Sequence, residues 1–324
     1  HNKLFTYDFY DHTGKKLNTT GYSTAINFSE GICGLQENSS STPYLADKTF
    51  KKIKDLVTVF KGPYSEGLAA SVNNTYPSRV VYLDKQGNEA VSIYGKDGGK
   101  CINGRMLISD GSWYYYYNRK GEKLGTKQWE ELADYSEGLA AAKSGAKWGF
   151  IDTMGTVVIP LQFDQVGSFT KGTAVVKSNG KFKLINKKGE SIDNNLYEGA
   201  GNPANGTFPL MKGDKVGLVD NKGTVIIGFN YKNIKPMSED RVWAMQDGKW
   251  GLLDNKGNAL TGFIYKDVAD FDKGYAKVKM SDKIGLINKA GKVILAADYS
   301  GLGSVYKNTM VGIKPAGVVM YSLK

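Results

Sequence analysis

Residues 135–168 read YSEGLAAAKSGAKWGFIDTMGTVVIPLQFDQVGS, and this stretch decides the fold because versions of it recur along most of the chain. Its Tyr/Phe-Ser-Glu-Gly start also appears at Phe28 to Gly31 and at Tyr64 to Gly67. The most regular feature is a glycine that recurs every 34 residues, at Gly87, Gly121, Gly155, Gly189, Gly223, Gly257 and Gly291. A constant period of this length is typical of a tandem repeat architecture.

Each copy contains short apolar runs that are rich in β-branched and aromatic residues and are bounded by Gly, Asn, Asp and Lys. These runs predict short strands joined by tight turns, and no stretch has the sustained periodicity of a helix. Adjacent apolar residues such as Leu252 and Leu253 point to opposite faces of a strand, so neighbouring repeats must cover both faces. We therefore expect an all-β fold of tandem 34-residue antiparallel β-meander repeats.

An Asp-x-x-Gly sequence, such as Asp152 to Gly155, follows the second apolar run of several copies. The Asp side chain can cap its own turn, and the Gly can adopt the positive φ that closes it. A calcium loop would need further carboxylates at fixed positions, which these sequences lack. The pattern therefore predicts a structural turn.

The repeat starts fall near residues 28, 64, 101, 135, 169, 203, 237 and 271, which indicates a single repeat domain over residues 1–324. Residues 1–27 match the later part of a repeat, and residues 305–324 match the first part of one. The two partial repeats can complete each other and close a propeller-like ring that hides the sheet edges. An open β superhelix, or solenoid, is the alternative.

The first two complete repeats are longer than the other six, and their extra residues lie in the loop between the first two strands. Insertions confined to equivalent loops fall on one side of a repeat protein, which is commonly the binding side. The enlarged loops cover about residues 35–43 and 72–80, with Tyr44 and Tyr76 in or beside them. Both tyrosines are candidates for stacking on a sugar ring or contacting a protein partner.

KWGFID at Lys147 to Asp152 and KWGLLD at Lys249 to Asp254 resemble the repeat named for its Trp-Gly pair, the WG (KWG) repeat of bacterial proteins. The surrounding SEGLA, DxxG and VVIP segments also match. The resemblance implies an exported or surface-attached protein without general enzymatic activity. We expect Trp148 and Trp250 to pack between repeats, because each lies in a strand that is covered on both faces.

Several kinds of site are not expected. Histidine occurs only at positions 1 and 12, which argues against a catalytic triad or a multi-histidine metal site. Glutamates at equivalent repeat positions do not make the two unlike carboxylates of a glycosidase, so we interpret Glu30, Glu66, Glu137 and Glu239 as structural. No cofactor is expected.

Three further features concern the setting of the chain. Cys33 and Cys101 lie two repeats apart, so we expect two free, largely buried thiols. No apolar run is long enough to span a membrane. The first residues, His1 to Phe5, do not have the pattern of a signal peptide.

The chain has a net charge of +11, and lysine recurs at the start of the second strand of five consecutive repeats, at Lys147, Lys181, Lys215, Lys249 and Lys283. A second series, before the turn glycine, contains Lys120, Lys188, Lys222 and Lys256. Regularly spaced lysines can form a binding surface for a polyanion, and they can also simply keep turns and sheet edges soluble.

We therefore predict a noncatalytic binding protein, secreted or at the cell surface, whose partner is an acidic glycan, a wall polymer or a protein. Nucleic acid is another polyanion that the first lysine series can bind. A structural scaffold without polyanion binding is the alternative from a different class, and a carbohydrate-active enzyme is a further one.

Overall fold

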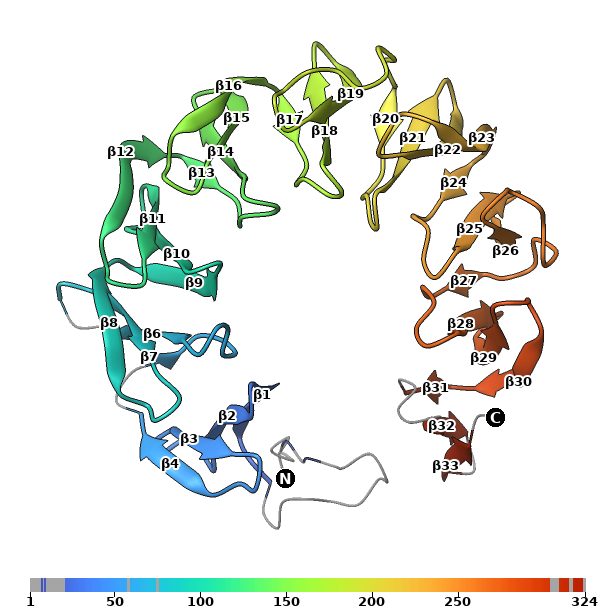
Figure 1. Cartoon of the computed structure of the whole chain (residues 1–324). Coiled ribbons are helices and arrows are strands. Elements are labelled where there is room, and N and C mark those ends of the chain that lie inside the picture. Colours follow the sequence, from blue (N-terminus) through green and yellow to red (C-terminus); the bar gives the residue numbers. More distant parts are fainter. Residues whose placement is uncertain are drawn as a thin grey trace. The chain divides into compact units, whose positions relative to one another are not determined.

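The computed structural model describes Tyr7, Phe9 and residues 21–56, 59–73, 76–303, 309–314 and 317–322. Within these residues all regular secondary structure is β, in 33 strands (Figure 1). The chain divides into two compact units, 1–162 and 163–324, which are considered separately. The expectation of a single repeat domain stays a prediction.

Unit 1 holds four sheets of four strands, in which strands consecutive along the chain pair antiparallel. These strands are β1 (Thr24–Ser29), β2 (Ile32–Gln36), β3 (Tyr44–Asp47), β4 (Lys52–Asp55), β5 (Val59–Phe60), β6 (Ala69–Asn73), β7 (Arg79–Leu83), β8 (Glu89–Tyr94), β9 (Asp97–Ile102), β10 (Arg105–Ser109), β11 (Tyr114–Asn118), β12 (Lys123–Trp129), β13 (Glu131–Leu132), β14 (Ala140–Ser144), β15 (Lys147–Ile151) and β16 (Val157–Phe163), the last of which ends at the unit boundary.

Unit 2 continues the same pattern in sheets of three or four strands. Its strands are β17 (Gln165–Val166), β18 (Thr173–Ser178), β19 (Lys181–Asn186), β20 (Gly199–Ala200), β21 (Thr207–Lys212), β22 (Lys215–Asp220), β23 (Val225–Tyr231), β24 (Asn233–Ile234), β25 (Arg241–Gln246), β26 (Lys249–Asp254), β27 (Asp267–Val268), β28 (Tyr275–Met280), β29 (Lys283–Asn288), β30 (Val293–Tyr299), β31 (Gly301–Leu302), β32 (Thr309–Lys314) and β33 (Gly317–Ser322).

The predicted meander is therefore confirmed, and its turns have the predicted chemistry. Asp152 Oδ1 accepts the backbone N–H groups of Met154 and Thr156, both at 2.9 Å, and Gly155 has a φ of 82°. The Ser-Glu-Gly turn is a two-residue hairpin in which Glu137 and Gly138 both have positive φ, 52° and 87°. Two successive left-handed residues are typical of a type I′ turn.

Neighbouring sheets cover each other's faces, as the paired apolar residues predict. Leu252 packs in a cluster with Ala276 and Ile287 of the following sheet. Leu253, the next residue, packs in a cluster with Leu218 and Ile227 of the preceding sheet. The core of each unit is therefore a series of apolar layers between consecutive sheets.

The glycine of the Trp-Gly pair has a steric explanation. A Cβ built on Gly149 in β15 would lie 2.5 Å from the carbonyl oxygen of Ile159 in β16, because the third strand crosses closely over this residue. Trp250 is 7% exposed and packs against the following sheet, as expected. Trp148 is only half-buried, and the Lys143 ammonium lies 5.7 Å from the centroid of its ring.

Two repeats differ from the expected pattern in their third strand. In the described part of the chain, residues 187–198 and 255–266 form isolated bridges, such as Phe182 with Tyr197, in place of a long strand. In the second of these segments the Thr261 hydroxyl accepts the backbone N–H of Leu252 at 2.9 Å. A side chain there provides the acceptor that a strand's carbonyl would have supplied.

The predicted closure of residues 1–27 onto residues 305–324 largely involves positions outside the described residues, so it stays a prediction. The described part of these segments includes β1, β32 and β33 and an isolated bridge between Tyr7 and Tyr22.

Candidate functional site

Each sheet has two ends, which carry different turns. In the sheet β13–β16, residues 145–146 form the hairpin turn between β14 and β15. The Glu137–Gly138 and Asp152–Gly155 turns lie at the opposite end, because successive strands run antiparallel. We call the first end the hairpin end and the second the stacking end.

Hydrogen bonds between consecutive repeats of unit 1 lie at the stacking end. The backbone N–H of Gly67 donates to Glu30 Oε2 at 2.9 Å. One repeat further on, the backbone N–H of Gly104 donates to Glu66 Oε2 at 2.9 Å. Each glutamate therefore reaches from its own turn to the equivalent turn of the next repeat.

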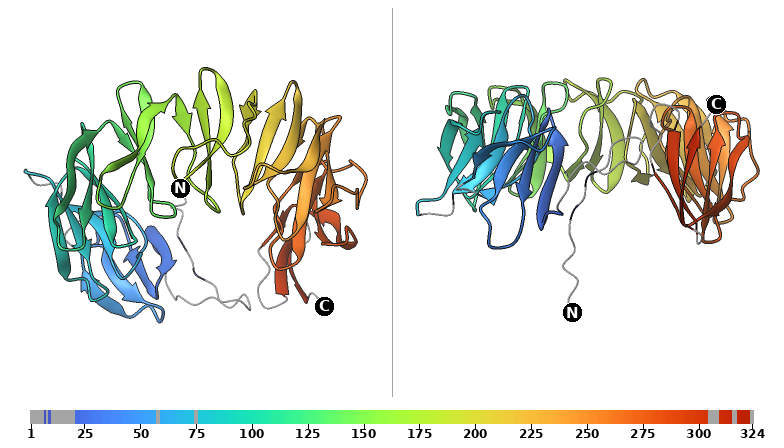
Figure 2. Two further views of the ribbon diagram at one scale, coloured as in Figure 1. Left: turned by 45° about the horizontal axis from the view of Figure 1, so that its top comes forward. Right: turned by 90° about the horizontal axis from the view of Figure 1, so that it is seen from below.

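Unit 2 has the same kind of connections. The backbone N–H of Gly274 donates to Glu239 Oε2 at 2.9 Å, and Asn221 Nδ2 donates to the carbonyl of Lys171 at 2.8 Å. Because such bonds join neighbouring repeats at their stacking ends, the hairpin ends lie on a common side within each unit (Figure 2).

The repeated glutamates are thus structural ties between repeats. Hydrogen bonding from the Gly104 backbone N–H is the main influence that holds the pKa of Glu66 below its ordinary value of 4.5. For Glu30, the side-chain hydrogen bond from Lys85 is the main influence that lowers the pKa. A general acid needs a raised pKa, so these carboxylates do not have the environment of one.

The first lysine series lies at the hairpin end, where each member is the first residue of its strand: Lys147 in β15, Lys181 in β19, Lys215 in β22, Lys249 in β26 and Lys283 in β29. Lys147 belongs to unit 1, and the other four follow one another through unit 2. The second series occupies turns at the stacking end. The two series are therefore on opposite ends of the sheets.

The lysines of unit 2 are not equally available. Lys181 makes an ion pair of 2.8 Å with Glu198. Lys215 is half-buried and adjoins Asp214, whose carboxylate pairs with Lys232 at 2.7 Å. Lys249 and Lys283 are exposed, and neither makes an ion pair with a described residue. These two are the most accessible cations of the series.

The net charge is unevenly distributed between the two units. Residues 163–324 contain 24 Lys and Arg against 15 Asp and Glu, whereas residues 1–162 contain 19 against 17. Unit 2 therefore carries +9 of the total charge of +11. Any long-range attraction for an anionic polymer comes mainly from unit 2.

The two candidate tyrosines have opposite environments. Tyr76 is fully exposed, as a contact residue should be. Tyr44 is only 8% exposed and belongs to a buried cluster with Cys33 and Leu35, so its ring is not available for stacking on a ligand. This corrects the expectation for Tyr44: it is the first residue of β3, and it faces the core.

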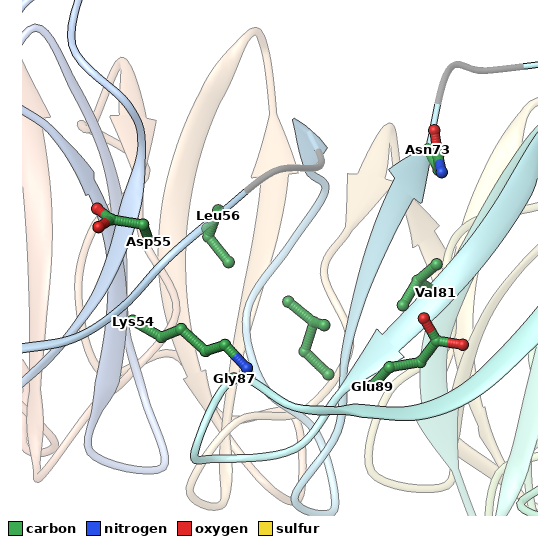
Figure 3. A pocket seen from close by; sticks show the side chains of 8 residues that line it. Lys54, Asp55, Leu56, Asn73, Val81, Gly87 and Glu89 are labelled. Carbon is green, nitrogen blue, oxygen red and sulfur yellow. The ribbon is translucent and has the colours of Figure 1, made fainter.

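Sequence reasoning did not identify a cleft between the first two sheets of unit 1 (Figure 3). Its volume is about 230 Å³, and it is lined by Lys54, Asp55, Leu56, Asn73, Val81, Leu83, Gly87 and Glu89. The only sequence signal near it is the enlargement of the two loops. Of its residues, Gly87 belongs to the glycine series with the 34-residue period, but that series marks a turn of every repeat and does not point to a cleft.

The remaining expectations concern thiols, metals and membranes. Both cysteines are free and buried, as predicted. The described residues contain no group of three or more His, Cys, Asp or Glu side chains that could hold a metal ion. None of the described segments is a helix that could span a membrane.

Comparison with known structures gives likenesses at low sequence identity. A crystal structure of the eukaryotic initiation factor matches with a TM-score of 0.54 and 10% identity, over 86% of this chain and 88% of that one. BamB from Moraxella catarrhalis matches with a TM-score of 0.36 and 12% identity, over 91% of this chain and 92% of that one. Kluyveromyces lactis Hsv2 matches with a TM-score of 0.38 and 8% identity, over 68% of this chain and 89% of that one. The first likeness confirms an all-β, propeller-like fold class, and the choice between a ring and a superhelix stays open.

No curated protein matches the chain. The family described as "WG containing repeat" matches residues 116–148, 148–182, 217–250 and 250–283. These tandem matches extend almost from one Trp-Gly position to the next, in agreement with the repeat that the structure builds around Gly149. The resemblance is therefore confirmed for these four stretches, which match the WG repeat.

Proposed function

We propose that this protein is a noncatalytic binding protein that holds an acidic glycan or wall polymer against the hairpin end of unit 2. The observation that carries the proposal is the concentration of charge in this unit, together with Lys181, Lys215, Lys249 and Lys283 at one end of successive sheets. The WG repeat resemblance supports the accompanying proposal that the protein acts outside the cell or at its surface.

The spacing of these lysines suits an extended polymer. Packed sheets lie about 10 Å apart, so equivalent side chains of successive repeats are separated by a distance of that order. This is close to the Debye length of about 8 Å at physiological ionic strength, so the cations repel one another only weakly. A polymer with anionic groups at a similar interval can meet several of them at once.

The ion pair at Lys181 does not prevent this binding. Its two side chains are 46% and 39% exposed, and ion pairs exposed to solvent in this way contribute little stability. An incoming carboxylate or sulfate can therefore replace Glu198 at little cost. Lys249 and Lys283 need no such exchange.

The experiment compares two variants that lose the same charge at opposite ends. In one, Lys215, Lys249 and Lys283 become Gln. In its control, Lys188, Lys222 and Lys256 at the stacking end become Gln. Binding to immobilised heparin and polygalacturonate is measured across a range of salt concentrations for both variants and the parent protein.

We expect the hairpin-end variant to bind more weakly than the parent protein. If each lysine meets one strong anionic group, the slope of log K against log salt concentration should become shallower by about 2–3. The control should keep most of the affinity. Equal loss in both variants would mean that overall charge alone attracts the polymer. Absence of binding by the parent protein would favour the structural scaffold.

A further inference from the structure

The cleft of Figure 3 lies between two walls that come from consecutive sheets of unit 1. On one side, Lys54 and Asp55 end β4 and Leu56 follows directly after it. On the other side, Val81 lies in β7 and Glu89 begins β8. The apolar side chains form the floor and the charged groups form the rim.

The floor is part of the packed core. Leu56, Val81 and Leu83 are 5–6% exposed and belong to the apolar cluster between the two sheets. Most binding sites for small molecules combine such apolar surface with a few polar groups that fix orientation. With about 230 Å³, the cleft is smaller than the about 300–1,000 Å³ of sites for drug-sized ligands, and it has room for one ring of a polymer.

The rim is held in place by bonds within the protein. Lys54 Nζ donates to Asn88 Oδ1 at 2.9 Å, and Asp55 pairs with the Lys52 ammonium. Glu89 is exposed, and its carboxylate has no ion pair or hydrogen bond with another described residue. It is therefore the rim group that is most readily available to accept a hydrogen bond from a ligand.

An aromatic and a cationic group lie beside the cleft in the same sheet, toward its hairpin end. Asn73, which lines the cleft, pairs across the sheet with Arg79, and Arg79 pairs with Tyr94. The Arg79 guanidinium lies 4.2 Å from the centroid of the Tyr94 ring and donates to Ser92 Oγ at 3.0 Å. Tyr94 is 62% exposed, so part of its ring can receive another flat surface.

The described ends of both enlarged loops lie beside this cleft. The backbone N–H of Leu56 donates at 2.7 Å to the carbonyl of Pro43, at the end of the first loop. The second loop leaves the sheet at Asn73 and returns at Arg79. The described ends of the two insertions thus meet one concave surface, which is the arrangement expected where loop length has been adapted to a ligand.

The charges of the rim indicate what kind of ligand fits. Among the residues that line the cleft, Lys54 provides one cation and Asp55 and Glu89 provide two anions, so the rim has a net charge of −1 and does not favour an anionic ligand. A sulfated or carboxylated sugar would place its anion near Asp55 and Glu89. A neutral sugar has hydroxyl groups that can donate to the carboxylates and accept from the Lys54 ammonium, and an apolar ring face that suits the floor and Tyr94.

We infer that the cleft between the first two sheets binds one ring of a neutral glycan, and that Glu89 accepts a hydrogen bond from a hydroxyl group of this ring. Tyr94 then covers the next ring of the same glycan, beyond the cleft. This site lies in unit 1, has different chemistry from the lysine series of unit 2, and does not depend on polyanion binding. The protein then has two modes of recognition, one for charge and one for sugar hydroxyl groups.

The test is an array of neutral oligosaccharides of glucose, galactose, mannose and N-acetylglucosamine, probed at a salt concentration high enough to suppress polyanion binding. The parent protein is compared with the variants Glu89→Ala and Tyr94→Ala. The control is Leu196→Ala in unit 2, which removes a side chain that is 59% exposed, as Tyr94 is 62% exposed. All the substituted side chains are exposed, so the variants should fold.

We expect the parent protein to bind at least one class of neutral sugar at high salt. The affinity should fall about tenfold or more in Glu89→Ala and in Tyr94→Ala, because the loss of a contact of about 1.4 kcal/mol lowers an affinity tenfold. The affinity of Leu196→Ala should be unchanged. Absence of binding to every neutral sugar would overturn the inference, and so would binding that neither cleft variant weakens. No binding in this array by a protein that binds heparin or polygalacturonate at low salt would also overturn it, while supporting the function proposed for unit 2.

Discussion

The carboxylate of Glu66 accepts the backbone N–H of Gly104 at 2.9 Å across 38 positions of the chain, and this bond joins one repeat to the next. Glu66 has a φ of 52°, a left-handed conformation that costs a non-glycine residue about 1–2 kcal/mol. The turn is therefore strained within its own repeat, and the bond that offsets the strain forms only when the following repeat is folded.

Replacing Glu66 by Ala should lower the free energy of unfolding by about 1–3 kcal/mol, because the carboxylate bonds to backbone N–H groups of Asn103 and Gly104 are lost. Urea denaturation followed by circular dichroism measures this change. Glu89→Ala is the control, since the Glu89 side chain is exposed and its carboxylate has no partner among described residues, and it should change stability by less than about 0.5 kcal/mol. Equal effects in the two variants would contradict a role for Glu66 as a tie.

Acid should weaken the same connections. The pKa of Glu66 and that of Glu30 are lowered from 4.5 in the folded protein, so the fold favours their charged forms. The resulting stability is present above the unfolded pKa and is lost as the pH falls through the folded pKa. The urea midpoint should therefore decrease between neutral pH and about pH 3, and it should decrease less in a Glu30→Gln, Glu66→Gln double variant. The same acid dependence in both proteins would place the titrating groups elsewhere.

Gly149 should not tolerate a side chain. A Cβ there would lie 2.5 Å from the Ile159 carbonyl oxygen, and backbone cannot move aside as easily as a side chain. We expect Gly149→Ala to destabilise the protein by about 1–3 kcal/mol, the usual cost of overpacking. Thermal unfolding measures it, with Gly62→Ala as the control because a Cβ on Gly62 meets nothing within 4 Å. If both variants melt alike, close strand crossing does not explain the Trp-Gly pair.

The thiols should be unreactive until the protein unfolds. Burial raises the pKa of the Cys33 thiol to about 12, and it also raises that of Cys101, so little thiolate exists at neutral pH. An aromatic disulfide reagent should label neither cysteine in the native state and should label both after denaturation in guanidinium. Rapid labelling of native protein would contradict the buried placement of Cys33 and Cys101.

Much of the architecture could be predicted because it depends on local sequence. Asp152 and Gly155 specify their turn through contacts within a few residues, and the alternating apolar side chains of each strand specify which faces are buried. The 34-residue spacing then places the same local structure again and again. These features need no knowledge of distant partners.

The candidate sites depended on contacts between repeats, which spacing does not reveal. Whether Tyr44 faced the loop or the core was settled by the strand that begins at this residue. The pairing of Lys181 with Glu198 and the cleft beside Glu89 likewise depend on which side chains the fold brings together. The position of the lysines could be predicted, but which of them are exposed and unpaired, and so available to a ligand, could not.

The hydrogen bonds between equivalent turns of consecutive repeats, such as those of Glu66 and Glu239, lie at one end of the sheets. The loops at the other end can therefore change without disturbing these bonds. Such a framework lets surface diversity accumulate along one rim while the number of modules grows or shrinks independently. New specificities can then be introduced by exchanging single hairpin loops, as is done when loops are grafted onto rigid display scaffolds.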